Sequence, residues 1–468
     1  MRTGNIVRLA FHPALLTLLF VIPALSQQRW ERNYGWVWYD EGSSVQQTSD
    51  GGYIVAGVYD YSGFNQQVYL IKTNASGDTL WTRTYGGMSY DWGYSVQQTS
   101  DGGYIVAGHT SSFGNGWQAY LIKTNASGDT LWTKTFGDTA YDLGYSVAQT
   151  SDTGYIVAGW SNSFGNGFQV YLIKTNASGD TLWTRTYGGA GRDEGHSVQQ
   201  TSDGGYIVAG HTDSFGNNRQ VYLIKTNALG DTLWTKTYGD TAFDLGQSVQ
   251  QTTDMGYIVA GSTNSFGNGY QVYLIKTNAL GDTLWTKTYG GVNDDHGSSV
   301  QQTSDGGYIV AGKSGSFGNG WQVYLIKTNA LGDTLWTRTY GGVDDEDGLS
   351  VRPTQDGGYI VAGGTSSFGI SGDVYLIKTD ANGSSGVEEN SGVRDQRSEV
   401  RMTVSPNPFV SFTTLPGHEA DRFSLYDISG RRVGVYKGDR IGEGLHAGVY
   451  FLKPEGKDSN PIRLVKLQ

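Results

Sequence analysis

The chain has 468 residues, no cysteine and a formal net charge of −11. Without cysteine it can form neither disulfides nor cysteine-ligated zinc sites, and its negative charge argues against nucleic acid as a partner. Its 70 glycines and 31 tyrosines make it too glycine-rich for a helical protein and too aromatic for a disordered one.

The N-terminal residues are first basic and then apolar. Arg2 and Arg8 precede or border the apolar run Ala10–Leu25, and small residues suited to cleavage surround Ser26. We therefore expect residues 1–26 to be a secretory signal peptide. A membrane anchor is the alternative, but the run is short for a span and contains two prolines.

A 51-residue repeat occupies most of the chain. The tyrosine of its GYIVAG motif lies at positions 53, 104, 155, 206, 257, 308 and 359, and that of YLIKT lies at 69, 120, 171, 222, 273, 324 and 375. The tryptophan of WT[RK]T[YF]G occurs in six full copies, at Trp81, Trp132, Trp183, Trp234, Trp285 and Trp336. A seventh copy stands alone before the first repeat, as Trp30–Gly35.

Each repeat predicts four strands. In the first repeat these are Ser44–Thr48, Tyr53–Gly57, Gln67–Thr73 and Thr79–Gly86. Glycine-containing turns separate the first strand from the second and the third from the fourth. In the third strand Tyr69 and Ile71 face one way and Leu70 the other, so both faces of the sheet should be covered.

These observations predict an all-β, seven-bladed β-propeller over residues 27–380. Blade seven lacks its outer strand, and Trp30–Gly35 can supply it and so close the ring. An open solenoid is the alternative, but it would leave Trp30 without partners and expose the edge of the last repeat.

Residues that recur in every blade are interpreted as structural. An acidic residue opens each repeat two positions before a glycine, at Asp40, Asp91, Asp142, Asp193, Asp244, Asp295 and Glu346. A carboxylate there can accept backbone N–H groups and fix a turn. A lysine also recurs in each blade, from Lys72 to Lys378, and we expect an ion pair or a packed stem rather than catalysis.

Two of these motifs resemble known propeller repeats. Asp91-Trp92-Gly93-Tyr94-Ser95 resembles the Asp-box of sialidase-type propellers, which implies a structural turn. Gly77-Asp78-Thr79-Leu80-Trp81 resembles the G-x-x-x-W element of quinoprotein propellers, which implies that the tryptophan joins neighbouring blades. Neither the sialidase arginine cluster nor the adjacent cysteines of quinoproteins are found, so we predict no catalytic residue, no cofactor and no metal ligand set.

Sequence variation is concentrated in the loops between second and third strands and in the crossovers between blades. These segments meet on one face of a propeller, and we expect that face to bind a protein or a glycan. Its candidate residues share one repeat position: Trp117, Phe168, Arg219, Tyr270 and Trp321. The alternative is that they pack against the next blade. Acidic crossovers could bind calcium, although solvated loops are favoured, and His109 and His211 are predicted to lie too far apart to share a metal.

The composition changes after the last repeat. Residues 381–399 predict a flexible linker, and residues 400–468 predict a small β-sandwich. Its motifs resemble the type A C-terminal sorting domain of the type IX (Por) secretion system, through Pro406, Asn407, Pro408, Phe409, Gly430, Gly448 and Tyr450. The resemblance implies passage through the periplasm, engagement of outer-membrane secretion machinery, and release or attachment at the cell surface.

Together these features predict an exported, monomeric, non-catalytic propeller that binds a partner. Two alternatives remain, an extracellular hydrolase or lyase acting on glycans and a purely structural surface protein. A glycan hydrolase needs two positioned carboxylates, for which the sequence offers only the acidic loops.

Overall fold

The computed structural model describes residues 28–35, 38–60, 65–114, 116–164, 167–216, 218–267, 269–369, 371–386, 411–414, 422–427, 431–437, 439–454 and 462–466. The chain divides into two compact units, Met1–Glu388 and Glu389–Gln468. The predicted signal peptide lies outside the described residues. Within the described residues, no helix has the length and apolar character needed to cross a bilayer.

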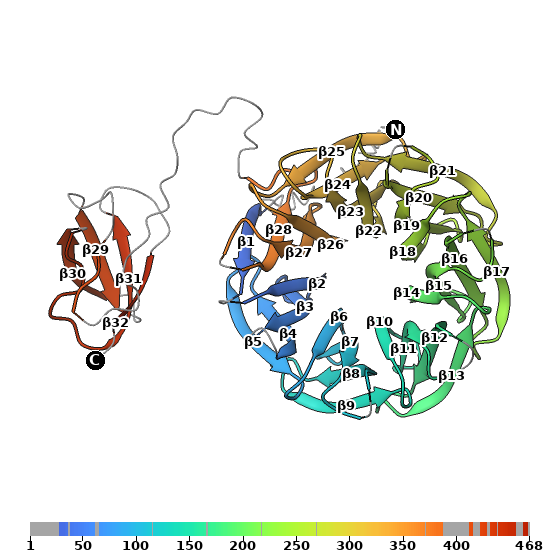
Figure 1. Ribbon diagram of the computed structural model, residues 1–468, viewed down its shortest axis with the longest axis horizontal. Helices are drawn as coiled ribbons and strands as arrows, with labels where there is room; N and C mark the ends of the chain where they lie inside the picture. The colour runs from blue at the N-terminus through green and yellow to red at the C-terminus, as the bar shows by residue number, and fades with distance from the viewer. Residues whose placement is uncertain are drawn as a thin grey trace, which may run out of the picture. The chain divides into compact units, whose positions relative to one another are not determined.

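The first unit is a ring of seven antiparallel four-stranded sheets (Figure 1). Its inner strands are β2 (Asp40–Gln47), β6 (Asp91–Gln98), β10 (Asp142–Gln149), β14 (Asp193–Gln200), β18 (Asp244–Gln251), β22 (Asp295–Gln302) and β26 (Glu346–Pro353). The second strands are β3 (Tyr53–Asp60), β7 (Tyr104–Thr110), β11 (Tyr155–Ser161), β15 (Tyr206–Thr212), β19 (Tyr257–Thr263), β23 (Tyr308–Ser314) and β27 (Tyr359–Thr365).

The two outer layers of the ring complete each blade. The third strands are β4 (Gln66–Thr73), β8 (Gln118–Thr124), β12 (Gln169–Thr175), β16 (Gln220–Thr226), β20 (Gln271–Thr277), β24 (Gln322–Thr328) and β28 (Asp373–Thr379). The outer strands are β5 (Thr79–Tyr85), β9 (Thr130–Phe136), β13 (Thr181–Tyr187), β17 (Thr232–Tyr238), β21 (Thr283–Tyr289), β25 (Thr334–Tyr340) and β1 (Trp30–Tyr34). The prediction of a seven-bladed propeller is confirmed.

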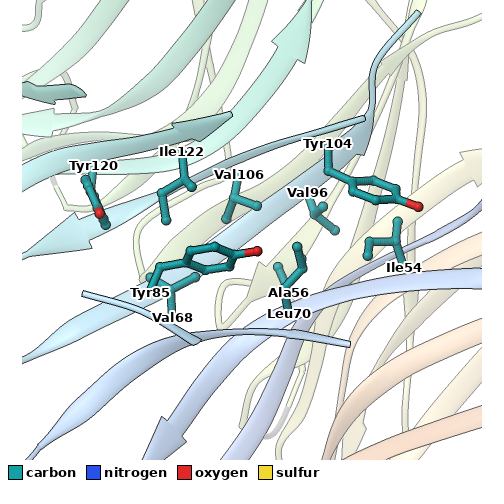
Figure 2. Close-up of a cluster of buried hydrophobic side chains, with 10 residues drawn as sticks. All are labelled: Ile54, Ala56, Val68, Leu70, Tyr85, Val96, Tyr104, Val106, Tyr120 and Ile122. Carbon is teal, nitrogen blue, oxygen red and sulfur yellow. The ribbon is translucent and has the colours of Figure 1, made fainter. Parts of the chain in front are cut away.

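The core lies between blades because the second and third strands of each blade are buried on both faces. Figure 2 shows the layer between the first two blades, where Ile54 and Leu70 of one blade meet Val106 and Ile122 of the next. The alternate residues of the same first-blade strands, such as Val55 and Ile71, pack instead against blade seven. Burial on both faces explains the strand sequences, which are β-branched and aromatic rather than alternately apolar and polar.

A repeated hydrogen bond joins the inner strands of neighbouring blades. In each pair a serine Oγ of one blade accepts the backbone N–H of a valine in the next, as between Ser44 and Val96 at 3.2 Å. The same bond recurs at the other five joints along the chain. It also links Val45 N to Ser350 Oγ at 3.2 Å, between the first blade and the seventh. The ring is therefore closed by the contact that joins its other blades.

Strand β1 completes blade seven. It pairs antiparallel with β28, from Trp30 opposite Lys378 to Tyr34 opposite Val374, and the two strands lie side by side in Figure 1. The Tyr34 hydroxyl donates to Gly77 O of blade one at 2.6 Å, as the Tyr85 hydroxyl does to Gly128 O one blade later. The isolated Trp30–Gly35 fragment thus acts as the missing outer strand.

The end of the propeller lies within the segment assigned to the linker. Asp380 N donates to Ser384 O at 2.9 Å, and Gly383 N donates to Asp380 O at 3.1 Å, the pattern that Asn74–Asp78 forms in blade one. Gly383 also lies beneath the Trp336 ring, as Gly77 lies beneath Trp30. Residues 381–384 therefore form the last turn of blade seven, and most of the remaining linker lies outside the described residues.

The second unit contains one four-stranded antiparallel sheet in its described part. Its order is β30 (Arg432–Lys437), β29 (Arg422–Asp427), β31 (Gly448–Pro454) and β32 (Ile462–Lys466). Phe423, Leu425, Ile441, Leu452 and Leu464 form its core, and an isolated bridge joins Thr413 to Ile441. A second sheet, which the predicted sandwich requires, stays a prediction because much of residues 400–421 lies outside the described residues.

Candidate functional site

The ring has two faces that differ in sequence. On one face, which we call the constant face, the same two turns recur in all seven blades. In blade one they are closed by bonds from Thr48 N to Gly52 O and from Asn74 N to Asp78 O, both at 2.9 Å. The variable face comprises the loops between second and third strands and the crossovers between blades. Its segments differ in sequence from blade to blade.

Buried carboxylates anchor the loops of the variable face. Asp91 is fully buried, and its Oδ2 accepts bonds from Gly87 N at 2.9 Å and from Ser112 Oγ at 2.6 Å. It therefore joins the crossover to the adjacent loop. Asp193 and Asp295 bind their loops through the same pair of groups, and Asp142 and Asp244 do so with Asp138 N and Asp240 N in place of a glycine N–H. Glu346 accepts the Gly342 N–H at 3.0 Å, and Asp40 accepts the Asp60 N–H at 3.0 Å.

The predicted binding residues do not converge on one point. Trp117 is 36% exposed, stacks on His109 with ring centroids 4.6 Å apart, and meets the edge of Tyr141 at 5.7 Å. Phe168 is half-buried and meets the edge of Trp160 at 4.8 Å. These side chains pack locally within their own part of the variable face.

The other three candidates lie in blades four to six. Arg219 is held by Asp213, with Nε and Oδ1 2.8 Å apart. Tyr270 and Trp321 flank the His296 ring, at centroid distances of 5.0 and 5.5 Å. Of the five candidates, Trp117 is therefore the one that remains exposed while the other four are half-buried.

A shallow hollow of about 480 Å³ lies beside Trp117. Two crossovers and one loop line it, through Ser89, Tyr90, Ser111, Gly116, Trp117, Thr139, Ala140 and Tyr141. Tyr90 and Tyr141 are 40% and 48% exposed. Three aromatic side chains thus border one opening on the variable face, with hydroxyl and backbone groups between them.

The acidic crossovers are engaged in local bonds. Asp294 Oδ1 accepts the Tyr270 N–H at 2.7 Å, and Asp345 Oδ1 accepts the Trp321 N–H at 2.9 Å. Asp347 forms an ion pair of 2.9 Å with Lys313, whose Nζ also lies 4.9 Å from the centre of the Trp321 ring. These acids position the loops that carry two of the candidate residues.

A cavity of about 250 Å³ lies on the ring axis, surrounded by the inner strands of all seven blades. Amide side chains line it, and Gln46 Oε1 accepts the Gln98 N–H of the next blade at 2.6 Å. Ala148 and Arg352 interrupt this series of glutamines. Burial lowers the pKa of Arg352.

Blade four brings together a histidine pair and a carboxylate that the sequence did not single out. Glu194 and His211 stand opposite each other on β14 and β15, and His196 lies at a bulge in β14. One ligand atom from each lies within 4.8 Å of the others. Sequence reasoning considered His211 only together with His109 and predicted that the two lie too far apart to share a metal. His211 instead meets His196, with ring centroids 5.1 Å apart. The signal that could have revealed this group is the sequence Glu194-Gly195-His196 near the start of an inner strand. At the position of His196 the other blades carry serine, tyrosine, glutamine or leucine, so the histidine is unique to blade four.

Comparisons with known proteins assign no family. No family model matches the chain. The regulatory protein FlaEY of Caulobacter vibrioides is 25% identical over 231 residues, which cover 43% of this chain and 24% of that protein. The chain thus matches about a quarter of the length of this relative.

Several solved structures show a limited likeness. Sqt1 from Chaetomium thermophilum has a TM-score of 0.44 at 11% identity, covering 70% of this chain and 80% of that one. BamB from Moraxella catarrhalis has a TM-score of 0.40 at 11% identity, covering 75% and 99%. The Pan2 WD40 domain of Neurospora crassa has a TM-score of 0.42 at 9% identity, covering 75% and 99%. The assignment of the fold rests on the strand pairing described above.

Proposed function

We propose that this protein is an exported, non-catalytic interaction module that binds a protein partner through the variable face of its propeller. The observation that carries the proposal is the contrast between the two faces. The constant face repeats one pair of turns seven times, whereas the variable face changes its side chains from blade to blade. Repeated turns are sufficient for a structural scaffold, whereas a surface that recognises a partner needs side chains that differ from place to place.

Large apolar side chains are exposed along the variable crossovers. Met88, Val292 and Val343 are exposed by 95%, 80% and 68%, and Trp38 and Phe243 are also exposed. Exposed leucines occur on the constant face too, at Leu229, Leu280 and Leu331, but they repeat one position of one turn. Diverse apolar groups rimmed by polar loops are typical of a protein-binding surface.

The hollow beside Trp117 is the best anchor point on this face. Aromatic side chains in a partly enclosed opening dominate the free energy of many protein interfaces. His109 and Tyr141 hold the Trp117 ring in place, so little side-chain entropy is lost when a partner binds.

The engaged carboxylates favour binding over catalysis. A glycan hydrolase needs two carboxyl groups that face an open cleft across a sugar. On the variable face the carboxylates of Asp91, Asp294 and Asp345 instead hold backbone or hydroxyl groups. Turnover of a polysaccharide by the mature chain would overturn this part of the proposal.

The binding surface is tested by a triple substitution around the hollow. We expect Tyr90→Ala, Trp117→Ala and Tyr141→Ala together to weaken partner binding by at least about tenfold, because truncating interface aromatics removes the largest contributions. A photoreactive residue in place of Met88, which is 95% exposed on the crossover that borders the hollow, identifies the partner on cells of the source organism, and calorimetry then gives its affinity. The matched control is Leu229→Ala, Leu280→Ala and Leu331→Ala on the constant face.

Several outcomes would contradict the proposed binding face. An equal loss of partner binding in the hollow variant and in the leucine control would mean that removing any exposed apolar side chains weakens binding, whichever face they lie on. Binding that survives both the hollow variant and combined replacement of Trp117, Tyr270 and Trp321 would place the partner elsewhere. A signal on a glycan array, lost in the hollow variant, would identify a carbohydrate partner instead of a protein.

We further propose that the C-terminal unit directs export. The motifs of the sorting-domain resemblance support this, although Pro406–Phe409 and Gly430 lie outside the described residues. Gly448 begins β31, and the Tyr450 hydroxyl donates to His446 O at 2.9 Å. Removal of residues 400–468 should leave the propeller in the periplasm while the full chain reaches the surface or medium. Export of the truncated chain would contradict this role.

A further inference from the structure

The strongest unassigned feature of the ring is the group formed by Glu194, His196 and His211. Cross-strand pairing sets Glu194 opposite His211, where β14 and β15 approach the variable face. The bulge between Gly195 and Ser197 leaves His196 without a partner residue on β15, and such a bulge redirects a side chain. Three potential metal ligands from two adjacent strands therefore face one point.

The distances between these ligand atoms suit a small metal ion. Glu194 Oε2 lies 3.3 Å from His196 Nε2 and 3.6 Å from His211 Nε2. Ligands bound tetrahedrally at about 2.0–2.1 Å, as in zinc sites, lie about 3.3 Å from one another. Because the three ligand atoms lie within 4.8 Å of one another, rotation of the imidazole side chains would be needed to bring all three to bonding distance of one ion.

The imidazole groups have hydrogen-bonding capacity that the protein does not use. His211 is 4% exposed, yet neither its Nδ1 nor its Nε2 has a hydrogen-bond partner among the described residues. In the same part of the chain, His196 Nε2 is also buried without a hydrogen bond. Buried polar atoms are normally satisfied, and leaving one unsatisfied costs about 1–3 kcal/mol. A metal ion that accepts one lone pair from each imidazole would remove the part of this cost that arises at the two coordinating nitrogens.

The three side chains are of types that bind transition metals. Imidazole and carboxylate groups are common zinc ligands, and both bind the metal in their deprotonated form.

We propose that Glu194, His196 and His211 bind one first-row transition metal ion, with Zn²⁺ as the best fit to two imidazoles and a carboxylate. The three side chains supply three positions of a tetrahedron. His196 is the most exposed of the three, so the fourth position opens toward the variable face and takes water or a donor group of another molecule.

Neighbouring side chains hold the carboxylate and one imidazole in position. Arg192 forms an ion pair with Glu194 Oε1, which leaves Oε2 directed at the two histidines. His196 stacks on Tyr145, with ring centroids 4.9 Å apart and planes inclined by 10°. Groups of this kind orient metal ligands, and their loss typically reduces metal affinity about 10–100-fold. The positive charge of Arg192 disfavours a cation, but its pairing with Glu194 offsets that effect.

Cobalt binding to the untagged full-length chain tests the proposal. After treatment with a chelator, Co²⁺ should bind with a stoichiometry of one per chain and give the visible absorption bands of tetrahedral cobalt. Zn²⁺ should abolish these bands by displacement and should raise the melting temperature, since a ligand that binds only the folded state stabilises it. His196→Gln and His211→Gln should each weaken binding by more than the loss of an outer-shell partner does, hence more than about 100-fold.

Blade two offers a matched control. His109 occupies the position of His211, but Trp92 stands opposite it and Tyr94 occupies the bulge. His109→Gln should therefore leave cobalt binding unchanged. Circular dichroism of each metal-free variant checks that it is folded, and His196→Gln is the milder change because its side chain is partly exposed. The proposal is overturned if the wild-type chain gives no tetrahedral spectrum, if the spectrum survives both substitutions, or if His109→Gln abolishes it.

Discussion

Two residues adopt a backbone conformation that the other blades assign to glycine. Thr153 and Met255 have φ of 66° and 67°, at the turn position where Gly51, Gly102 and Gly204 have φ of 80–82°. The left-handed region is unfavourable for residues with a Cβ, above all for a β-branched one. A Cβ built at Gly102 meets nothing within 4 Å, so the cost at this position comes from the backbone alone.

Replacing Thr153 by glycine should stabilise the propeller. We expect the free energy of unfolding to rise by up to about 1 kcal/mol, because the strain of the left-handed conformation exceeds the entropy that glycine loses on folding. Urea denaturation measures the effect. Gly102→Thr makes the opposite change at the matched position and should lower stability by a similar amount. A lower unfolding midpoint for Thr153→Gly would contradict the argument.

The limits of sequence reasoning at the residue scale are clear in blade four. The roles of recurring side chains could be predicted, because a residue present in all seven blades is expected to stabilise the blade rather than to form a single site. The group of Glu194, His196 and His211 occurs once, and it forms through a cross-strand register and a bulge. Alternation along a strand does not predict which side chain a bulge redirects. His211 was therefore considered only with His109, which lies two repeats earlier.

At the scale of elements, strand β1 does two things for the ring. It covers the edge of β28, and its Trp30 binds blade one. Trp30 is 7% exposed, meets the edge of Tyr53 at 5.7 Å and donates from Nε1 to Ala75 O at 3.2 Å. Trp81 and Tyr104 make the same ring contact one blade later, at 5.9 Å. The two tryptophans make the same ring contact, although Trp81 is only partly buried, and their strands are connected to the ring differently.

Trp30→Ala should destabilise the protein and also promote its association. Loss of a buried aromatic costs about 3–5 kcal/mol, and a detached β1 would expose the edge of β28 to other chains. Trp81→Ala is the matched control, because β5 remains joined to its blade through the turn after β4. We expect both variants to unfold at lower urea concentrations, and light scattering to show association for Trp30→Ala alone. Equal association of both variants would show that β1 does not protect that edge.

At the scale of the whole molecule, most of the propeller could be predicted from the spacing of motifs. The 51-residue repeat predicted the number of blades and their strands, and the isolated Trp30 indicated how the ring closes. The last turn was assigned to the linker because Asp380–Ser384 differs from its counterparts in composition, although Gly383 keeps the glycine position of Gly77. The contacts of the variable face could not be predicted, since loop side chains are positioned by single hydrogen bonds such as that from Tyr270 N to Asp294.

Seven buried lysines connect the stability of the whole ring to pH. Lys72 Nζ is buried, donates to Thr73 O at 2.8 Å and forms an ion pair of 2.9 Å with Asp50. The same pair recurs in every blade. Partial burial would raise the pKa of Asp50, but hydrogen bonds from Thr48, Lys72 and Gly52 N lower it to about 2. The pKa values of its six counterparts are also lowered.

We therefore predict that the propeller loses stability cooperatively as the pH falls from about 4 to 2. A carboxylate whose pKa is lower in the folded state stabilises that state above its unfolded pKa of about 3.9, and the contribution disappears as the pH falls through the folded value. The seven equivalent pairs contribute additively to the change of the free energy of unfolding with pH, even though solvent screens each aspartate and makes each contribution small. Unfolding midpoints in urea, measured between pH 2 and 5, should fall steeply. Replacing Asp50, Asp101 and Asp203 by asparagine should lower stability at pH 7, where each lysine loses its partner, and should also flatten the pH dependence. An unchanged slope in this variant would show that other carboxylates control the acid response.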